Sequence, residues 1–326
     1  MHPLVSLCLI GLVLAVAGFT PRAEADDELF ERVEHGFADN NGVKIHYVSL
    51  GEGPLVVMIH GFPDFWYSWR HQMPALAQHY RVVAMDLRGY NQSDQPEAQE
   101  AYAVPHLIGD VAAVIAACGE EKAVIVGHDW GGYIAWCFAA FQPECIKRLI
   151  VCNLPHPKGL TRELANNPEQ QAASAYARAF QETDAHKIVS TPFLAAMVAG
   201  DDPQVRSRYE EAFAKSDVEA MLAYYKENYP KPPYTETAAP FPKITVPVLL
   251  FHGLADSALH HHGLNNTWEW LEAPLTLVTI PGADHWVHHD AAQHVTDMML
   301  SWLSLHAEDA PPPAKPKPFA PTTPTE

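Results

Sequence analysis

Short apolar runs alternate along the chain with longer stretches of helical pattern. The runs at residues 54–60, 123–128 and 246–251 are almost wholly apolar, whereas residues 43–48 alternate between apolar and polar positions. Unbroken runs bounded by Gly, Pro, Asp or Asn indicate strands that are buried on both faces. Further runs of this character lie at residues 81–86, 148–153 and 275–280. The order of elements predicts an α/β protein with a mostly parallel sheet between layers of helices.

The alternation stops between Leu154 and Phe241. This stretch is rich in Ala, Glu, Lys, Arg and Tyr and has no clear strand pattern, and prolines cluster at both of its ends. We therefore expect a helical cap at 154–241, inserted between a first core segment at 26–153 and a second core segment at 242–307.

The two ends of the chain differ from this core in composition. Residues 4–19 are almost entirely apolar and precede Ala23-Glu24-Ala25, the small-residue pattern of a signal peptidase site. This run is shorter than the roughly 20 residues that span a bilayer. It predicts a signal peptide at 1–25, export to the periplasm or the exterior, and no stable membrane insertion after cleavage. Because Met1-His2-Pro3 carries no Lys or Arg, a retained anchor is the alternative. Residues 308–326 predict a Pro-rich disordered tail.

The net charge limits the classes of binding partner, and the cysteines leave disulfide formation open. The formal net charge of −18 disfavours nucleic acid and anionic membrane surfaces, which this field would repel. Export would permit disulfides among Cys118, Cys137, Cys145 and Cys152, although Cys137 and Cys152 fall in segments predicted to be buried. The pairing of these cysteines and the oligomeric state are left open.

Asp129 is the strongest candidate for a reactive group. It lies in Gly127-His128-Asp129-Trp130-Gly131, after a predicted strand and before a predicted helix. Small residues around a central side chain at a strand-to-helix turn form the nucleophile elbow of the α/β-hydrolase fold. Here the central residue is a carboxylate instead of serine. The alternative is that Asp129 merely caps the following helix.

The elbow fold places an acid and then a histidine after the nucleophile. His285 follows the last predicted strand and Asp256 follows the strand before it, so both side chains are expected at neighbouring strand ends. In some relatives the acid follows an earlier strand instead, but that position is Asn153 here. We therefore predict Asp129, Asp256 and His285 as the catalytic triad.

The loop beginning at His60 completes this constellation. His60-Gly61-Phe62-Pro63 follows an apolar strand, which predicts the backbone N–H groups of Phe62 and Trp130 as the oxyanion hole. The other strand-end histidines, His60, His128 and His252, are interpreted as structural. The run His260-His261-His262, with His288 and His289 grouped beside it, is interpreted as a solvated loop rather than a metal site, since no carboxylate accompanies it.

From about Gly42 to Leu303 the chain resembles the epoxide hydrolase branch of the α/β-hydrolase superfamily. The resemblance rests on the elbow, on His60-Gly61-Phe62-Pro63, and on two further motifs, Trp66-Tyr67-Ser68-Trp69-Arg70 and Asp86-Leu87-Arg88-Gly89-Tyr90. It also includes the cap, where Tyr176 stands four residues before Phe180-Gln181 and Tyr225 ends a Leu-x-aromatic-Tyr pattern. The chain departs from the family at Thr183-Asp184, commonly Pro-Gly, and at Asn91, usually Gly.

The resemblance implies an enzyme that opens a small apolar epoxide to a vicinal diol with water. Asp129 would form an alkyl ester, cap residues Tyr176 and Tyr225 would protonate the epoxide oxygen, and His285 with Asp256 would activate water. Neither a metal nor an organic cofactor is required by this scheme. Tyr224 and Tyr229 remain alternatives to Tyr225.

Three other functions remain open at this level. A haloalkane dehalogenase would use the same triad, but many such enzymes have Asn where Phe62 stands, and they lack the paired tyrosines. A fluoroacetate-type dehalogenase would carry Arg at the position of Trp130. A non-catalytic binding protein would commonly lack one of the triad residues, all of which are present.

Overall fold

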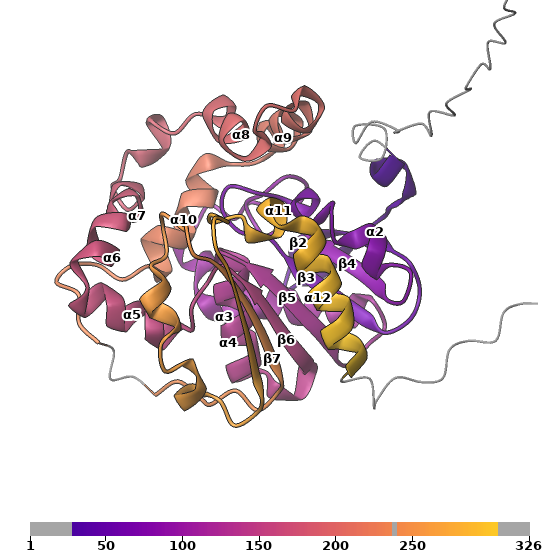
Figure 1. The fold of residues 1–326 in the computed structure, drawn as a ribbon. Helices are drawn as coiled ribbons and strands as arrows, with labels where there is room; N and C mark the ends of the chain where they lie inside the picture. The colour runs from indigo at the N-terminus through magenta and orange to yellow at the C-terminus, as the bar shows by residue number, and fades with distance from the viewer. Residues whose placement is uncertain (1–27, 237–239, 306–326) are drawn as a thin grey trace, which may run out of the picture.

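The computed structural model describes residues 28–236 and 240–305, and its centre is an eight-stranded sheet in the order β1-β2-β4-β3-β5-β6-β7-β8 (Figure 1). The strands are β1 Glu34–Asn40, β2 Val43–Leu50, β3 Leu55–Ile59, β4 Arg81–Met85, β5 Ala123–His128, β6 Ile146–Cys152, β7 Val248–Gly253 and β8 Leu275–Ile280. In this order, the strands from β4 to β8 run parallel to their neighbours. Strand β2 is antiparallel to both of its neighbours, β1 and β4. The mostly parallel α/β architecture predicted from the apolar runs is therefore confirmed.

The edge strand β1 was not expected from the apolar pattern. It forms a hairpin with β2, in which Asn40 pairs with Val43 across the two-residue turn Asn41-Gly42. Both turn residues have positive φ, 54° and 89°, as the tight hairpin turn demands. The Asn-Gly pair was the sequence signal for this strand, because it is strongly preferred in such turns.

Helices cover both faces of the sheet. On one face α3 (Val104–Ala117) packs against α4 (Trp130–Phe141), and on the other α12 (Ala292–Leu305) packs against α2 (Met73–Leu76) and α11 (Val287–Asp290), as Figure 1 shows. Short 3-10 helices are η1 Trp66–Trp69, η2 Gln99–Tyr102, η3 Pro143–Cys145, η4 Ala185–Lys187, η5 His261–Leu264 and η6 Thr267–Trp270. Strands β3, β5 and β7 are buried at every position, which explains their unbroken apolar sequences.

The segment between β6 and β7 is helical. Its helices are α5 Pro157–Asn166, α6 Pro168–Ala173, α7 Ala175–Phe180, α8 Thr191–Ala199, α9 Pro203–Lys215 and α10 Val218–Asn228. Helices α5, α6 and α9 begin with proline. The N–H groups of the first helical turn have no partner within the helix, so the missing N–H of proline costs no hydrogen bond there. Figure 1 shows these helices as an arc beside the carboxyl ends of the parallel strands. We refer to them as the cap; the domain boundaries given above remain predictions.

Buried hydrogen bonds join the cap to the core. Tyr209 on α9 donates its hydroxyl to Asp64, 2.7 Å away, and Tyr224 on α10 donates to the carbonyl of Arg88 at 2.9 Å. All of these side chains are buried. The cap is therefore attached to the loops that follow β3 and β4, close to the strand ends where the candidate site was expected.

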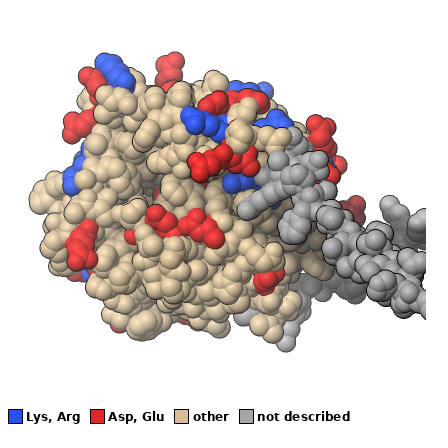
Figure 2. Space-filling view, turned by 45° about the horizontal axis from the view of Figure 1, so that its top comes forward, with Lys and Arg blue, Asp and Glu red and all other residues tan. Residues whose placement is uncertain are grey.

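The predicted signal peptide and tail lie outside the described residues. Within residues 28–236 and 240–305, none of the helices has the length and apolar character needed to cross a membrane. On the face shown in Figure 2, acidic and basic side chains are intermixed in the upper part of the view, and most of the charged side chains lower down are acidic.

Candidate active site

Asp129 occupies the sharp turn between β5 and α4. Its backbone has φ 51° and ψ −120°, a combination that is strained for a residue with a side chain. The turn also requires glycine nearby, because a Cβ atom on Gly131 would lie 2.1 Å from the carbonyl oxygen of Ile59. The strand, turn and helix expected of a nucleophile elbow are therefore present, with a carboxylate at the tip.

The hydrogen bonds of Asp129 decide between the two interpretations of this residue. Its side chain makes no capping bond to α4, so the helix-cap alternative is wrong. Instead the backbone N–H of Phe62 donates to Oδ1 at 2.8 Å, and Oδ2 lies 3.4 Å from Nε2 of His285. Burial alone would raise the pKa of Asp129, but His285 and the Phe62 N–H hold it below its usual value. Asp129 is thus an anion aimed into the site.

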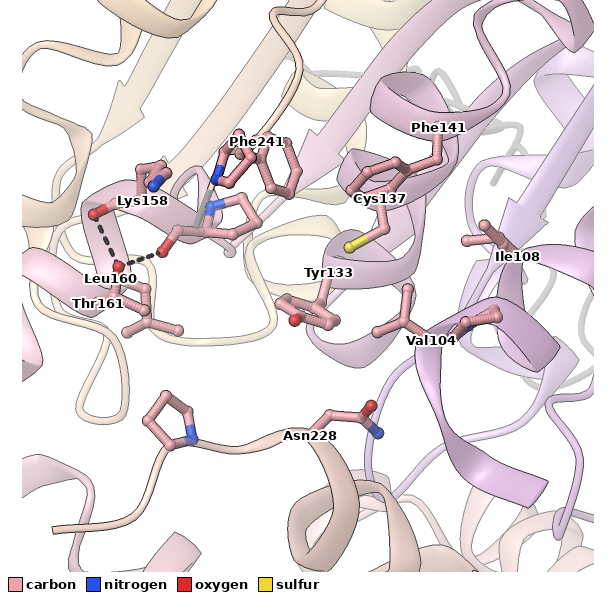
Figure 3. A pocket seen from close by; sticks show the side chains of 14 residues that line it. Val104, Ile108, Tyr133, Cys137, Phe141, Lys158, Leu160, Thr161, Asn228 and Phe241 are labelled. Carbon is pink, nitrogen blue, oxygen red and sulfur yellow. Dashed lines mark hydrogen bonds between the residues drawn. The ribbon is translucent and has the colours of Figure 1, made fainter. Parts of the chain in front are cut away.

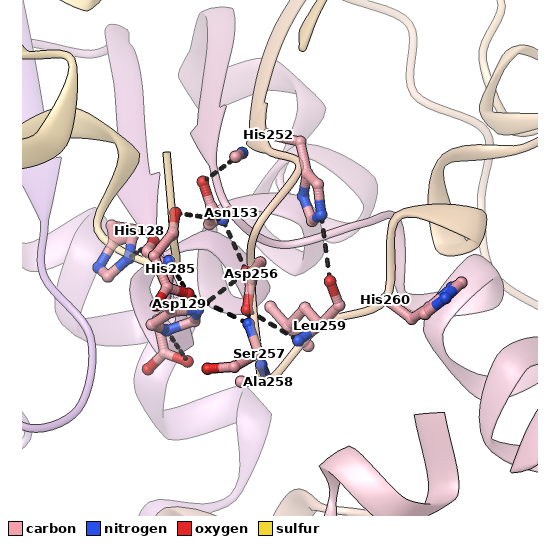
Figure 4. Close-up of polar contacts among 12 residues, drawn as sticks. His128, Asp129, Asn153, His252, Asp256, Ser257, Ala258, Leu259, His260 and His285 are labelled. Carbon is pink, nitrogen blue, oxygen red and sulfur yellow. Dashed lines mark hydrogen bonds and ion pairs between the residues drawn. The ribbon is translucent and has the colours of Figure 1, made fainter. Parts of the chain in front are cut away.

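His285 and Asp256 meet as their positions after neighbouring strands predicted. Nδ1 of His285 lies 3.0 Å from Oδ2 of Asp256 (Figure 4). Burial would lower the pKa of His285, but Asp256 and Asp129 more than offset this and hold it well above its ordinary value. In turn, the pKa of Asp256 lies far below normal, since its pairing with His285 outweighs desolvation. Asp129, His285 and Asp256 therefore form one buried group in which the histidine and the two carboxylates shift each other's pKa.

Asn153, which was considered only as a failed acid, holds Asp256 in place. Its Nδ2 donates to Oδ2 of Asp256 at 2.6 Å and to the carbonyl of Asp284 at 3.2 Å. The backbone N–H groups of Ala258 and Leu259 donate to the other oxygen of Asp256 at 2.8 and 2.9 Å. Both oxygens of Asp256 therefore accept hydrogen bonds that stabilise the anion.

The loop that carries His285 is held by residues of the core, one of which also binds the cap. Nε2 of His128 contacts the carbonyl of His285 at 2.9 Å, and burial lowers the pKa of His128 to about 3, so that it is neutral. The next residue, Trp286, packs edge-on against the His285 ring and donates to Asp64, the acceptor of the Tyr209 hydroxyl. The structural role predicted for His128 agrees with this contact.

The two cap tyrosines face Asp129. Tyr176 on α7 and Tyr225 on α10 line the same cavity as Asp129, with their rings 6.0 Å apart and nearly perpendicular. Burial raises the pKa of both phenols well above the ordinary value. The alternatives are engaged elsewhere, because Tyr224 donates to Arg88 and Tyr229 to Ser174. The geometry therefore favours the pair predicted from the sequence.

Two neighbouring cavities lie beneath the cap, and the inner one contains the carboxylate of Asp129. The inner one, of about 30 Å³, is lined by Asp129, Trp130 and the two cap tyrosines. The outer one, of about 520 Å³, lies between α3, α4 and α5 (Figure 3) and is lined almost wholly by apolar side chains. Both cavities share the residues Tyr133, Leu160, Asn228 and Pro230. A mostly apolar chamber therefore adjoins the small cavity that contains Asp129.

The remaining histidines and cysteines have other surroundings. His60 contacts the carbonyl of Gly61 and accepts from the N–H of Leu87, and His252 contacts the carbonyl of Leu259, which fits their predicted structural roles. The grouping of His288 and His289 with the run at 260–262 was wrong, because both lie in α11 and contact Ser68. The four described cysteines are free thiols, and burial raises the pKa of Cys137 to about 12.

Comparisons with known proteins agree with this arrangement. The model of the alpha/beta hydrolase fold family matches residues 54–292. Mouse epoxide hydrolase 4 is 32% identical over 81% of this chain and 77% of its own length, and epoxide hydrolase 1 of Caenorhabditis elegans is 32% identical over 81% and 69%. The crystal structure of a mutant of an epoxide hydrolase from Bacillus megaterium superposes with a TM-score of 0.78, at 31% identity, covering 82% of this chain and all of that one. The chain therefore belongs to the epoxide hydrolase branch of the α/β-hydrolase superfamily.

Proposed function

We propose that this protein hydrolyses an apolar epoxide to a vicinal diol through an alkyl ester on Asp129. The observation that carries the proposal is the meeting of an anionic carboxylate with two phenolic hydroxyls in one cavity. A carboxylate suits attack on a saturated carbon, and neutral phenols suit donation to the oxygen that leaves it.

In the first step, Oδ2 of Asp129 attacks a ring carbon of the epoxide. The carbon–oxygen bond of the ring breaks, and its oxygen takes a proton from Tyr176 or Tyr225. Oδ1 stays hydrogen-bonded to the N–H of Phe62 and becomes the carbonyl oxygen of the ester. The N–H of Trp130 begins α4 and is the second donor that we assign to this oxygen.

In the second step, water attacks the ester carbon, Cγ of Asp129. His285 takes the proton of that water through Nε2 while Asp256 stabilises the resulting imidazolium through Nδ1. Collapse of the intermediate breaks the bond between Cγ and Oδ2, and the departing alkoxide takes the proton held by the His285 imidazolium and leaves as the diol. The second proton of the water returns to the phenolate that was formed in the first step. Asp129 returns as a carboxylate.

The function is tested by comparing styrene oxide with a 1-bromoalkane in single-turnover assays. We expect diol from the epoxide, and a loss of at least about 10²-fold in its rate in the Tyr176→Phe/Tyr225→Phe double variant, because proton donation of this kind contributes about that much. Halide release that survives the loss of both hydroxyls, with no diol formed, would instead identify a haloalkane dehalogenase.

The two steps are expected to differ in their dependence on pH. Ester formation removes the charge of Asp129, one of the two carboxylates that raise the pKa of His285, so this pKa falls as the base is needed. Ester hydrolysis requires neutral His285 and will therefore speed up as pH rises, then level off. Ester formation requires only anionic Asp129 and protonated phenols, so it will stay flat across neutral pH. Rapid-quench assays, read by intact mass spectrometry, measure the rate of ester formation. A rate of ester formation that changes with pH in the neutral range would contradict this assignment.

The apolar outer chamber supports a substrate with a bulky apolar substituent. In Val104→Trp, the larger side chain would fill part of this chamber without touching the triad. We expect kcat/KM for a naphthyl-substituted epoxide to fall about 10–100-fold, the range typical of one steric conflict, while propylene oxide changes by less than about threefold. Equal losses for both epoxides would show that the chamber does not hold the substituent.

A further inference from the structure

Three consecutive histidines gather at the surface beyond the catalytic acid. One ring nitrogen from each of His260, His261 and His262 lies within 4.8 Å of the other two. Their ring centroids are 4.4 to 4.7 Å apart. This convergence is a property of the folded loop, since the sequence alone does not dictate that three adjacent imidazoles face a common point.

A carboxylate from the cap joins this cluster. Oε2 of Glu169, in the first turn of α6, lies 2.9 Å from Nε2 of His260. The interpretation of the run as a solvated loop relied on the lack of a carboxylate, and Glu169 removes that objection. Three imidazoles and a carboxylate form a donor set that zinc accepts. Four direct ligands would use Nε2 of His260; if Glu169 instead stays on Nε2 and orients the ring, the metal takes Nδ1, which must then give up the N–H of His262 that it accepts at 3.3 Å.

The spacing requires only small side-chain movements. Ligand atoms around tetrahedral zinc lie about 3.3 Å apart, as follows from metal–ligand distances of about 2.0–2.1 Å. The contact between Glu169 and His260 is already near this spacing. His261 and His262 are exposed, so their rings can rotate into place without disturbing the core.

The backbone beneath these side chains is fixed by the cap. The N–H of His260 donates to Oε1 of buried Gln170 at 2.8 Å, and Nε2 of Gln170 donates to the carbonyl of Ala258 at 2.9 Å. Arg162 on α5 donates to the carbonyl of His262 at 2.8 Å. Because the backbone of this loop is already held, only side-chain freedom is lost when the histidines bind a metal, which favours binding.

We propose that His260, His261 and His262 with Glu169 form a transition-metal site, for Zn²⁺ or a divalent ion of similar preference, that joins the cap to the core. The loop that carries the histidines begins at the catalytic acid Asp256, and Figure 4 shows His260 beyond Leu259 on that loop. Glu169 lies on the helix before the one that carries Tyr176. A bound metal would therefore connect the loop that begins at Asp256 to the cap, without contacting the reacting atoms.

Calorimetric titration of Zn²⁺ into the chelator-treated chain, purified without a histidine tag, tests the site. We expect one equivalent to bind per chain, the melting temperature to rise with Zn²⁺, and both effects to weaken at acid pH, where imidazoles are protonated. In His261→Ala/His262→Ala, affinity should fall by more than about 100-fold and the thermal shift should vanish, because two of the ligands are lost. In Glu169→Gln, affinity should fall about 10-fold or more, in the range known for the partners of metal ligands.

His294→Ala is the matched control, because His294 is an exposed histidine on α12 outside the cluster. This variant should bind Zn²⁺ as the unaltered chain does. Without metal, all variants should keep the melting temperature of the parent within about a degree, which separates lost ligands from lost structure. Equal Zn²⁺ affinity in the double variant and the parent would overturn the proposal, as would binding that leaves the melting temperature unchanged.

Discussion

Replacing His285 by Gln will stop the reaction at the ester and leave the substrate attached to Asp129. The first step needs only the carboxylate and the phenols, whereas the second needs a base at Nε2 of His285, 3.4 Å from Oδ2 of Asp129. Intact mass spectrometry should show the chain heavier by one molecule of epoxide. Steady diol release should fall by at least about 10³-fold, as is usual when a triad residue that acts as a unit is removed.

Two further variants give this experiment its meaning. Asp129→Asn should form no adduct, because an amide oxygen is a poor nucleophile. His294→Gln, which changes an exposed side chain of α12, should release diol at the parent rate. Diol release from His285→Gln at near the parent rate, or an adduct that survives the loss of Asp129, would contradict a two-step reaction through this carboxylate.

The features that could be predicted from the sequence are those encoded by local pattern and chain order. Strand β5 matches residues 123–128 and is buried throughout, as a continuous apolar run bounded by turn residues predicts. Strand β8 has the predicted bounds, 275–280, but it lies at the edge of the sheet and none of its residues is buried, so the expectation of burial on both faces was wrong for this strand. Asp256 and His285 could be paired because both follow strands that are neighbours in this fold. The order of the motifs along the chain was therefore enough to predict that Asp256 and His285 lie close together.

The features that sequence reasoning missed depend on contacts between distant segments. Asn153 looked like the absence of an acid, and only the folded chain shows its amide on Asp256. Glu169 and His260 are far apart in sequence, so no local pattern links them. Asn91 departs from the glycine usual in the family, yet it adopts φ 45° and its amide donates to Asp86, a local bond that helps asparagine tolerate this conformation.

Asp256→Asn is expected to reduce turnover by about 10²–10⁴-fold, because a neutral amide can neither stabilise the imidazolium nor fix its tautomer. Asp256 is also the acceptor for the amide of Asn153, so the variant places two amides against each other. Burst kinetics should locate the loss in ester hydrolysis. Thermal unfolding of the same sample would show whether the fold is retained.

A double variant that exchanges the carboxylate of Asp256 with the amide of Asn153 tests whether His285 needs the charge of Asp256 or its position. In Asp256→Asn/Asn153→Asp, the acid and the amide exchange places, so the pair keeps the same charge while the carboxylate follows β6 instead of β7. An aspartate can adopt the positive φ of 42° seen for Asn153, since both residue types tolerate it. We expect the double variant to turn over at least about tenfold faster than Asp256→Asn, because a single negative charge close enough to stabilise protonated His285 is restored. Asn153→Asp alone should not be more active than the parent, since it sets two buried carboxylates side by side. If the double variant were no faster than Asp256→Asn, orientation of His285 by Asp256 would matter more than its charge.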